Sequence, residues 1–555
     1  MWVLGLNAPP AGWHDSAACL VDGDGEIIAF SEEERHNRRR HSLFRRPDSA
    51  ARLCLDTAGI SASDIDVVAI GWDSRQLYPD LSDAEFLSGA VGLDFGKRSP
   101  EVVYVGHHRA HAASSFYASP FQAAGVLVVD GHGENESSSI WTFMYGRQPR
   151  LERSWGRASS LGYAYDAAST WLGFSFLDAG KTMGLAAYGR AGGVAAEPLV
   201  EVTADDFRLA VRPAAEDRDS DKNGHATAHD VKALYDRTVA AWRKRYASIV
   251  GADGPSLRAG ELDGDRKAVR VAYMAQRIIE ETVTGLAALS RKLSGHTELC
   301  LSGGVALNCS TNGTLPGPLY VPPVPHDAGV ALGAAWIVSP PRKPGSALSP
   351  FLGTPLAAQA ASGPQPSAEQ GGLSCEPLDI EAVTSLLLDG CVGAVAEGRA
   401  EVGPRALCHR SIIAIPDTPQ VATRVNAIKR REPWRPFAGV AREQYAARLW
   451  ECQEHLSRYM LGAAKVGEMG RGVAPAVVHV DGTTRPQVLY GDEAPVVGSL
   501  LDALDREGKP PVLLNTSFND RGMPIVDTAA DALAEFQAMD LDFLILGDML
   551  YRKHA

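Results

Sequence analysis

The chain lacks several features that would each place it in a particular class of protein. No stretch of about 18 consecutive apolar residues occurs among its 555 residues, so no segment is predicted to cross a membrane. Its eight cysteines are scattered and include no CxxC pair, which argues against a disulfide framework and favours a reducing cytoplasm. The first residues resemble a strand followed by a Pro-Pro turn, not a charged segment before an apolar core, so we expect no signal peptide.

A surplus of positive charge is also missing. The formal net charge is −13 at pH 7, which argues against a protein that binds nucleic acids. A small anionic ligand in a local basic pocket is still compatible with this charge. A hydrophobic content of 45% and a charged content of 22% are typical of a folded protein, and the length predicts two to four domains.

The N-terminal residues predict four strands and one helix. Apolar segments at 3–6, 16–21 and 26–30 are expected to form strands, the last two joined by the turn Asp22-Gly23-Asp24-Gly25. A helix is expected from about residue 48, and a fourth strand at 67–71.

The same layout recurs further along the chain. Residues 125–130 predict a strand that enters a polar, Gly-rich turn, and residues 137–145 predict the returning strand. This weak repeat resembles the duplicated ribonuclease-H-like fold of the sugar kinase, chaperone and actin superfamily, in which two such turns face each other across a cleft and hold nucleotide phosphates. Two unrelated βαβ units are the alternative, and periodicity alone does not separate them.

The remaining sequence predicts an α/β chain of two domains. Residues 200–260 are charged and irregular, which predicts an insertion with a helical second half, and a long amphipathic helix is expected over 268–293. The composition then shifts to Pro, Gly, Ala and Ser. We expect an N-terminal domain over 1–345, a linker over 346–375, and a C-terminal domain over 376–555 that alternates strands and helices.

A candidate metal site begins with the run His107-His108-Arg109-Ala110-His111. On a helix, His107 and His111 share one face and can bind one transition-metal ion, whereas His108 points off that face. For such a pair in isolation we favour an ordinary hydrogen-bonding role. Asp130 and Asp327 are candidate carboxylate ligands, although Asp327 can equally cap a helix. Two imidazoles with carboxylates suit Fe(II), Zn or Mn better than Ca.

Three other N-terminal motifs have residue types that suit phosphate or proton chemistry. In the turn after the strand at 298–301, Gly303 and Gly304 open a predicted helix that places Asn308 and Asn312 on one face, suitable for ribose or base contacts. Lys181 starts a Gly-flanked helix and can touch a phosphate or lie on the surface; the spacing of its glycines excludes a P-loop. His14, in the first hairpin turn, is a candidate general base or a loop hydrogen-bond donor.

The C-terminal domain carries arginines beside Gly and Pro, at rigid turns. The motifs are Gly403-Pro404-Arg405, Trp434-Arg435-Pro436 and Thr484-Arg485-Pro486, followed by residues 514–522, which include Asn515 and Arg521. In an acidic protein such a set predicts a pocket for phosphate-bearing ligands, although any one arginine can instead be structural.

Together these motifs resemble the carbamoyltransferase family of antibiotic and nodulation-factor biosynthesis over nearly the whole chain. The resemblance runs from the opening residues 3–7, His14-Asp15 and residues 32–35 through HHRAH, GKTMGLAAYG, SGGVALN and PPVPHDAGVALGAA to EVGPRALCHRS, WRPFA, TTRPQ and LNTSFNDRG. It implies that a C-terminal YrdC-like domain forms carbamoyladenylate from carbamoyl phosphate and ATP. An N-terminal actin-like domain, similar to the threonylcarbamoyl transferase of tRNA modification, would then pass the carbamoyl group to a hydroxyl of a small natural product such as an aminoglycoside, a macrolide or another glycoside.

The resemblance also implies roles for particular residues. The metal ligands would be His107, His111, Asp130 and Asp327; His14 would take the hydroxyl proton, and Arg40 stands where a lysine is often seen. The carbamoyl phosphate and ATP pocket, with Mg accompanying ATP, would comprise Arg405, Lys429, Arg435, Arg485, Asn515 and Arg521. The N-terminal adenylate contacts would be Lys181, Gly303, Gly304 and Asn308. A sugar-kinase-like phosphotransferase, which would leave the arginine-rich second domain unexplained, and a non-enzymatic nucleotide-gated scaffold are the alternatives.

Overall fold

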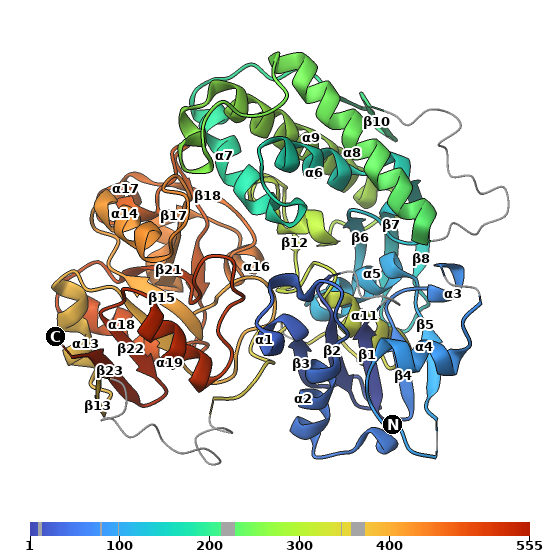
Figure 1. Cartoon of the computed structure of the whole chain (residues 1–555), viewed down its shortest axis with the longest axis horizontal. Helices are drawn as coiled ribbons and strands as arrows, with labels where there is room; N and C mark the ends of the chain where they lie inside the picture. The colour runs from blue at the N-terminus through green and yellow to red at the C-terminus, as the bar shows by residue number, and fades with distance from the viewer. Residues whose placement is uncertain are drawn as a thin grey trace. The chain divides into compact units, whose positions relative to one another are not determined.

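The computed structural model describes residues 1–8, 14–77, 80–97, 99–211, 228–345, 347–356 and 372–554. The chain divides into two compact units, which we describe separately. The first unit comprises Met1–Glu33 and His41–Leu348, and the second comprises Glu34–Arg40 and Ser349–Ala555 (Figure 1). Most of the predicted linker lies outside the described residues. Within the described part of the chain, no helix is long and apolar enough to cross a membrane.

The first unit contains two five-stranded sheets with the same topology. The order of the first sheet is β3-β2-β1-β4-β5, in which β1 pairs antiparallel with β2 and parallel with β4. The second sheet has the order β8-β7-β6-β11-β12, and β6 likewise pairs antiparallel with β7 and parallel with β11. This repeated strand order confirms the predicted duplication of a ribonuclease-H-like fold and rules out two unrelated βαβ units.

The bounds of β1, β2, β3, β4, β6, β7 and β11 agree with the sequence pattern to within one or two residues, whereas β5, β8 and β12 were not predicted. The strands of the first sheet are β1 Val3–Asn7, β2 Ala17–Val21, β3 Ile27–Glu32, β4 Val67–Ile70 and β5 Glu101–Tyr104. Those of the second sheet are β6 Ala123–Val129, β7 Glu136–Met144, β8 Arg150–Gly156, β11 Leu299–Ser302 and β12 Leu319–Tyr320.

Two helices pack against each other between the sheets. Helix α5 (His107–Ala118) contacts β6 and β11, and helix α11 (Gly329–Val338) contacts β1 and β2. Small residues allow the close approach, since a Cβ added at Gly333 would lie 1.8 Å from the carbonyl oxygen of Ala110. The other face of the first sheet is covered by α2 (Asp48–Ala58), while α3 (Ser74–Leu77) and α4 (Asp83–Ala90) follow β4.

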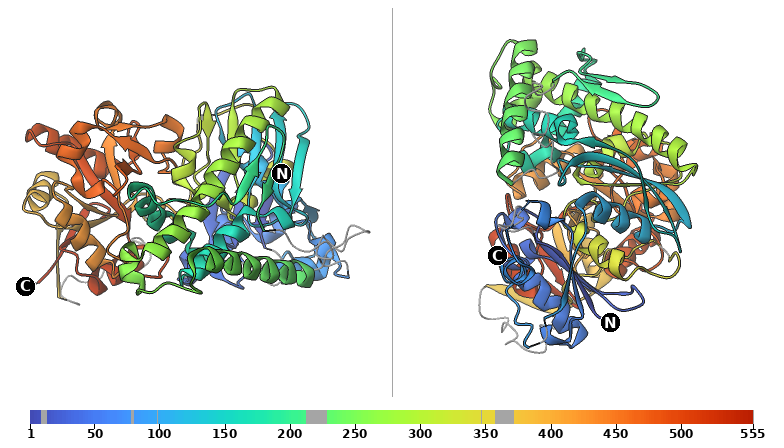
Figure 2. Two further views of the ribbon diagram at one scale, coloured as in Figure 1. Left: turned by 90° about the horizontal axis from the view of Figure 1, so that it is seen from above. Right: turned by 90° about the vertical axis from the view of Figure 1, so that its right-hand side faces the viewer.

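A layer of helices covers the other side of the second sheet. Both Figure 1 and the two views of Figure 2 place this layer opposite α5 and α11. It comprises α6 Leu161–Trp171, α7 Ala179–Ala191, α8 Ala228–Val250 and α9 Arg266–Ser294. Helix α9 begins where Asp265 accepts hydrogen bonds from the backbone N–H groups of Lys267 and Ala268, and it ends at Gly295, whose φ is 74°. Helix α8 confirms the helical second half of the predicted insertion, whose first part contains the hairpin β9 Val200–Val202 and β10 Phe207–Leu209.

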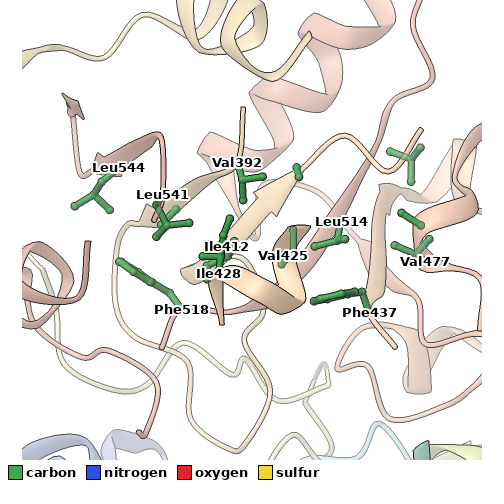
Figure 3. Close-up of a cluster of buried hydrophobic side chains, with 14 of the residues drawn as sticks. Val392, Ile412, Val425, Ile428, Phe437, Val477, Leu514, Phe518, Leu541 and Leu544 are labelled. Carbon is green, nitrogen blue, oxygen red and sulfur yellow. The ribbon is translucent and has the colours of Figure 1, made fainter. Parts of the chain in front are cut away.

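The second unit is built on an eight-stranded mixed sheet with the order β13-β23-β22-β14-β15-β21-β16-β20. Alternate residues of its strands enter two different cores. Ile412 and Leu514 belong to one cluster, which Figure 3 shows, and Ile413 and Leu513 belong to the other. Because a strand turns successive side chains to opposite faces, this alternation means that the sheet is buried on both sides.

The elements of the second unit have the following bounds. The large sheet comprises β13 Leu373–Pro377, β14 Gly393–Ala396, β15 Arg410–Ala414, β16 Ala438–Arg442, β20 Gln487–Leu489, β21 Val512–Ser517, β22 Phe543–Leu546 and β23 Met549–Lys553. A small sheet comprises β17 Trp450–Glu451, β18 Ala464–Val466 and β19 Thr483–Thr484. The helices are α1 Glu33–Asn37, α13 Ile380–Leu388, α14 Pro419–Ile428, α15 Glu443–Leu449, α16 Glu454–Ser457, α17 Glu468–Val473, α18 Pro495–Arg506 and α19 Ala529–Ala538.

One predicted element differs from the structure. The helix expected after Gly303-Gly304 is a 3₁₀ turn over Gly304–Leu307 followed by the single-turn helix α10 (Cys309–Asn312). The break occurs at Asn308, whose side chain caps α10 by accepting a hydrogen bond from the N–H of Thr311. Asn308 and Asn312 therefore do not share one helical face, and Asn312 is fully buried.

Candidate metal centre and active site

Helix α5 presents its two histidines to the same point. It begins at His107, directly after β5 and Gly106, so that His107 and His111 are one turn apart and their Nε2 atoms lie 3.1 Å from each other. The Gly106 position provides no side-chain cap; instead the carboxylate of Glu134 accepts hydrogen bonds from the N–H of His107 at 3.0 and 3.1 Å. His108 points away, as the sequence predicts, and its Nδ1 bonds to Ser139 Oγ at 2.8 Å.

Two carboxylates from distant parts of the chain complete this cluster. Asp130 follows β6, and its Oδ2 lies 3.1 Å from His107 Nε2 and 3.5 Å from His111 Nε2. Asp327 precedes α11, and its Oδ1 lies 3.7 and 3.6 Å from the same two nitrogens. One potential ligand atom from each of the four buried residues falls within 4.8 Å of the others. Two imidazoles and two carboxylates form a donor set that suits a first-row transition metal.

Surrounding groups orient the imidazoles. His107 Nδ1 lies 3.3 Å from the carbonyl oxygen of Gly71, and because a carbonyl only accepts, Nδ1 carries the proton. Ser302 donates to the carbonyl of Pro325 and lies 3.3 Å from His111 Nδ1, which fixes the same tautomer. The ring of Trp72 stacks on His107 at 3.8 Å between centroids. Both Nε2 atoms therefore face the cluster, which is the orientation that metal-binding histidines require.

The charges within the cluster are strongly coupled. Burial lowers the pKa of His111, but the hydrogen bonds and charges of Asp130 and Asp327 outweigh burial and raise it to about 9. Burial raises the pKa of Asp130, but the two histidines hold it well below its usual range. The carboxylates therefore stay ionised and attract positive charge to this point, either a proton or a metal ion.

His14 lies beside the cluster. Its Nδ1 is 2.9 Å from Asp15 Oδ2 and 3.9 Å from Asp327 Oδ2. Burial lowers the pKa of His14, but the hydrogen bond to Asp15 and the charges of Asp327 and Asp130 raise it to about 10. A divalent cation among these carboxylates would oppose that rise, because like charges disfavour the protonated imidazole.

The other predicted N-terminal residues have varied environments. The N–H of Gly304 donates to Asp130 Oδ1 at 2.8 Å, and a Cβ at Gly303 would lie 2.2 Å from the carbonyl oxygen of Val129, so this turn fits closely against the end of β6. Asn308 exchanges two hydrogen bonds with Gln276, at 2.9 and 3.0 Å. Lys181 lies in the first turn of α7 and pairs with Asp178 at 3.0 Å. Arg40 is exposed and belongs to the segment that groups with the second unit.

The second unit brings several predicted cations close to one another. Lys429 is buried, and burial together with Arg431 and Arg435 holds its pKa well below its usual range. Burial, Arg435 and Arg485 likewise lower the pKa of Arg431. Four positive groups therefore repel one another, which is the property expected of a pocket that receives a polyanion. The sequence pattern missed Arg431, although it stands between Lys429 and Arg435.

The remaining predicted residues of this unit lie nearby or in its interior. Arg435 and Arg521 both approach Glu432, at 3.6 and 3.5 Å. Asn515 is buried and donates to Gln487 Oε1 at 2.6 Å and to the carbonyl of Ala406, the neighbour of the half-buried Arg405. In contrast, two other arginines of this region have structural roles.

Arg410 is fully buried and donates to the backbone carbonyls of Asp527 and Glu397 at 3.0 and 2.6 Å. Arg399 donates to those of Leu352 and Gly353. These two therefore fasten loops to the sheet instead of facing a ligand.

Comparison with known proteins identifies relatives of the whole chain. The family described as "Carbamoyltransferase N-terminus" matches residues 87–336, and "Carbamoyltransferase C-terminus" matches residues 384–553. Nodulation protein NolNO of Sinorhizobium fredii is 31% identical, over 99% of this chain and 80% of its own length. Nodulation protein NolO of Bradyrhizobium diazoefficiens is 32% identical, over 80% of this chain and 78% of its own length.

Solved structures show more distant likenesses. Full-length HypF in the phosphate- and nucleotide-bound form is 14% identical, with a TM-score of 0.32 over 61% of this chain and 55% of its own. A ROK family glucokinase from Streptomyces griseus is 14% identical, with a TM-score of 0.25 over 61% of this chain and 99% of its own.

Fold and site together define an α/β protein with a duplicated ribonuclease-H-like unit of the actin and sugar-kinase type, carrying a buried His–Asp cluster that can bind a metal ion. The chain belongs to the carbamoyltransferase family and is a transferase enzyme. The resemblance in its motifs is therefore confirmed.

Proposed function

We propose that this enzyme is an ATP-dependent O-carbamoyltransferase that acts through carbamoyladenylate on a hydroxyl group of a small natural product. The observation that carries the proposal is the position of His14, 3.9 Å from a carboxylate of the His–Asp cluster. Transfer from an adenylate to an alcohol needs a proton acceptor and concentrated positive charge at one place. The first unit supplies both.

The second unit would form the adenylate, as a YrdC-like domain. Carbamoyl phosphate, ATP and one water would give carbamoyladenylate, phosphate and pyrophosphate, which balances the atoms. Both substrates are polyanions, and Lys429, Arg431, Arg435 and Arg485 form the cluster that suits them. Arg405, Asn515 and Arg521 complete the proposed pocket, and Mg would accompany ATP.

The first unit would carry out the transfer. His14 takes the proton of the acceptor hydroxyl, the oxygen forms a bond to the carbamoyl carbon, and the bond from that carbon to the phosphate oxygen breaks, releasing AMP. His107, His111, Asp130 and Asp327 would hold the metal; we favour Fe(II), and Zn or Mn suit the same donors. When bound, a divalent cation supplies positive charge that neutralises the adenylate phosphate. Lys181, Gly303, Gly304 and Asn308 would contact the adenylate, and Arg40 would assist.

The test is to supply the enzyme with carbamoyl phosphate, ATP, Mg and a panel of aminoglycosides, macrolides and other glycosides. The expected products are a carbamoylated acceptor, AMP and pyrophosphate. A H14N variant should lose transfer yet still exchange pyrophosphate into ATP, whereas H554N, at an exposed position, should behave like the wild type. Release of ADP with a phosphorylated acceptor would instead establish the sugar-kinase-like alternative.

A further inference from the structure

Asn7, the last residue of β1, holds the loop that carries His14. Its Nδ2 donates to the backbone carbonyls of His14 and Asp15, at 3.3 and 2.9 Å. Its Oδ1 accepts the indole N–H of Trp72 at 3.0 Å, and the ring of Trp72 stacks on His107. Asn7 is only 1% exposed. One buried amide therefore ties the loop of the proposed base to the ring that packs on a proposed metal ligand.

The backbone of Asp15 has a conformation that its surroundings must hold in place. Its φ is 55°, in the left-handed region that residues other than glycine rarely adopt. The N–H of Asp15 donates to the carbonyl of His41 at 2.7 Å, and its own carbonyl accepts the bond from Asn7. The hydroxyl of the next residue, Ser16, donates to the carbonyl of Arg45. Strained backbone of this kind clusters at active sites, where it orients a side chain.

The side chain of Asp15 bonds to two histidines. Its Oδ2 lies 2.9 Å from His14 Nδ1, and its Oδ1 lies 2.8 Å from His41 Nδ1. Burial raises the pKa of Asp15, but the charge of His41 and the hydrogen bonds of both histidines hold it well below its usual range. An ionised carboxylate only accepts, so both Nδ1 atoms carry a proton. Asp327 Oδ2, at 3.9 Å, is too far away to form a hydrogen bond with His14 Nδ1.

We propose that Asp15 is a positioning residue that holds His14 with Nδ1 protonated, so that Nε2 is the atom that takes the proton of the acceptor hydroxyl. The inference rests on the proposed function and specifies its proton transfer. The O–H bond of the acceptor breaks, the proton goes to Nε2, and the oxygen keeps the electron pair with which it attacks the carbamoyl carbon. His41 holds the second oxygen of the carboxylate, and Asn7 holds the backbone, so the carboxylate stays in place.

The first experiment measures carbamoyl transfer by D15N. The new amide can donate to His14 Nδ1, which would leave the ring proton on Nε2 and disable the base. We expect kcat to fall about 10²- to 10⁴-fold while the KM of the acceptor is nearly unchanged. D24N, which removes an exposed carboxylate from the turn between β2 and β3, is the matched control and should behave like the wild type. A wild-type kcat in D15N, or an effect confined to KM, would overturn the inference.

A double-mutant cycle separates positioning from folding. If Asp15 acts only through His14, adding D15N to the H14A variant should not lower the residual rate of transfer any further. A general structural role of Asp15 would lower the rate in both backgrounds, and that result would refute the inference.

Proton NMR of the full-length protein tests the geometry without turnover. A proton in a charge-assisted hydrogen bond between an imidazole and a carboxylate resonates far downfield. We expect one such signal that is absent from H14N and another that is absent from H41N, and D15N should lose both. A His14 signal that persists in D15N would overturn the inference.

The two measurements distinguish this inference from the proposed function. If the protein transferred no carbamoyl group but showed the signals that depend on Asp15, the positioning of His14 would be supported and the activity refuted. If D15N transferred carbamoyl groups as fast as the wild type, the activity would be supported and the positioning role of Asp15 refuted.

Discussion

The carboxylate of Glu134 accepts the backbone N–H of His107 through both of its oxygens, at 3.1 and 3.0 Å. The same carboxylate accepts the N–H of Asp73, which follows β4. Glu134 lies in the turn between β6 and β7, four residues after Asp130. One buried side chain thus ties the start of the histidine-bearing helix to the loop that carries a carboxylate of the same cluster.

We therefore expect substitution of Glu134 to weaken metal binding without removing a ligand. In E134A the N–H groups of His107 and Asp73 lose their acceptor, and the metal affinity should fall by 10- to 100-fold, the range typical for residues that support ligands. E134Q keeps the shape of the side chain but removes its negative charge from the helix N-terminus, so its metal affinity should fall by less than that of E134A. Calorimetric titration of Fe(II) or Zn into the protein measures both. E136Q, two residues away, is the matched control. If E134A bound the metal as tightly as E136Q does, Glu134 would not hold the histidine-bearing helix in place.

The histidine pair provides a second prediction. H107N and H111N should each lower the metal affinity by more than about 100-fold, because even supporting residues cost 10- to 100-fold. H108Q should retain the metal, since His108 faces Ser139 and not the cluster. Elemental analysis of the purified variants, with carbamoyl transfer assayed before and after chelation, gives the result. A metal content in H107N equal to that in H108Q would contradict the assigned ligands.

The repulsion among the cations of the second unit predicts that removing one of them weakens ligand binding without lowering the stability of the protein. Arg485 lowers the pKa of Arg431 by its positive charge, so R485Q should relieve this repulsion and leave the protein at least as stable without ligand. The same variant should bind ATP and inorganic phosphate at least about tenfold more weakly. Thermal melting with and without each ligand measures both effects. R506Q, on the exposed face of α18 and paired with Glu381, is the control. If unliganded R485Q melted at a lower temperature than the unliganded wild type, the inferred repulsion between Arg485 and Arg431 would be wrong.

Glu397 predicts a pH dependence of stability. Burial raises its pKa from 4.5 to about 7; Glu401 adds to the rise, and the N–H of Val496 opposes it. The unfolded chain therefore ionises this group at lower pH than the folded protein does. Stability from Glu397 is present below about pH 4.5 and is lost as the pH rises to about 7.

At about 1.4 kcal/mol per pKa unit, that loss amounts to at most about 3.5 kcal/mol. E397Q, which does not titrate, should show a flatter dependence of the free energy of unfolding on pH between these limits. E507Q, at an exposed position, should follow the wild type. If E397Q and the wild type have parallel curves, the assignment to Glu397 fails.

Much of the fold followed from local patterns. Apolar segments and Gly-rich turns predicted the strands β1, β2, β3 and β6 to within one or two residues, because a strand buried on both faces needs a continuous apolar run. The long helix α9 was equally clear from its periodicity. The helix after Gly304 was predicted wrongly, since the pattern could not reveal that the side chain of Asn308 would cap a new turn.

The site was predicted in part. Residue types and spacing indicated His107 and His111 as a pair, because the helical period alone places residues four apart on one face. Glu134 and Arg431 were missed, because each matters through a neighbour distant in sequence or through burial. No local signal marks a glutamate as the cap of a helix that begins 27 residues earlier.

The sequence by itself determined the α/β alternation of strands and helices, the helical histidine pair and the family to which the chain belongs, and the strand order of the two sheets then established the duplication. Only the tertiary structure decided that Asp130 and Asp327, from the ends of different elements, meet that pair within 4.8 Å, and that Arg399 and Arg410 hold loops while Arg431 joins the cation cluster. The reason is physical: periodicity specifies which face of one element a side chain occupies, whereas distances, burial and shifted charges arise only when separate elements pack together.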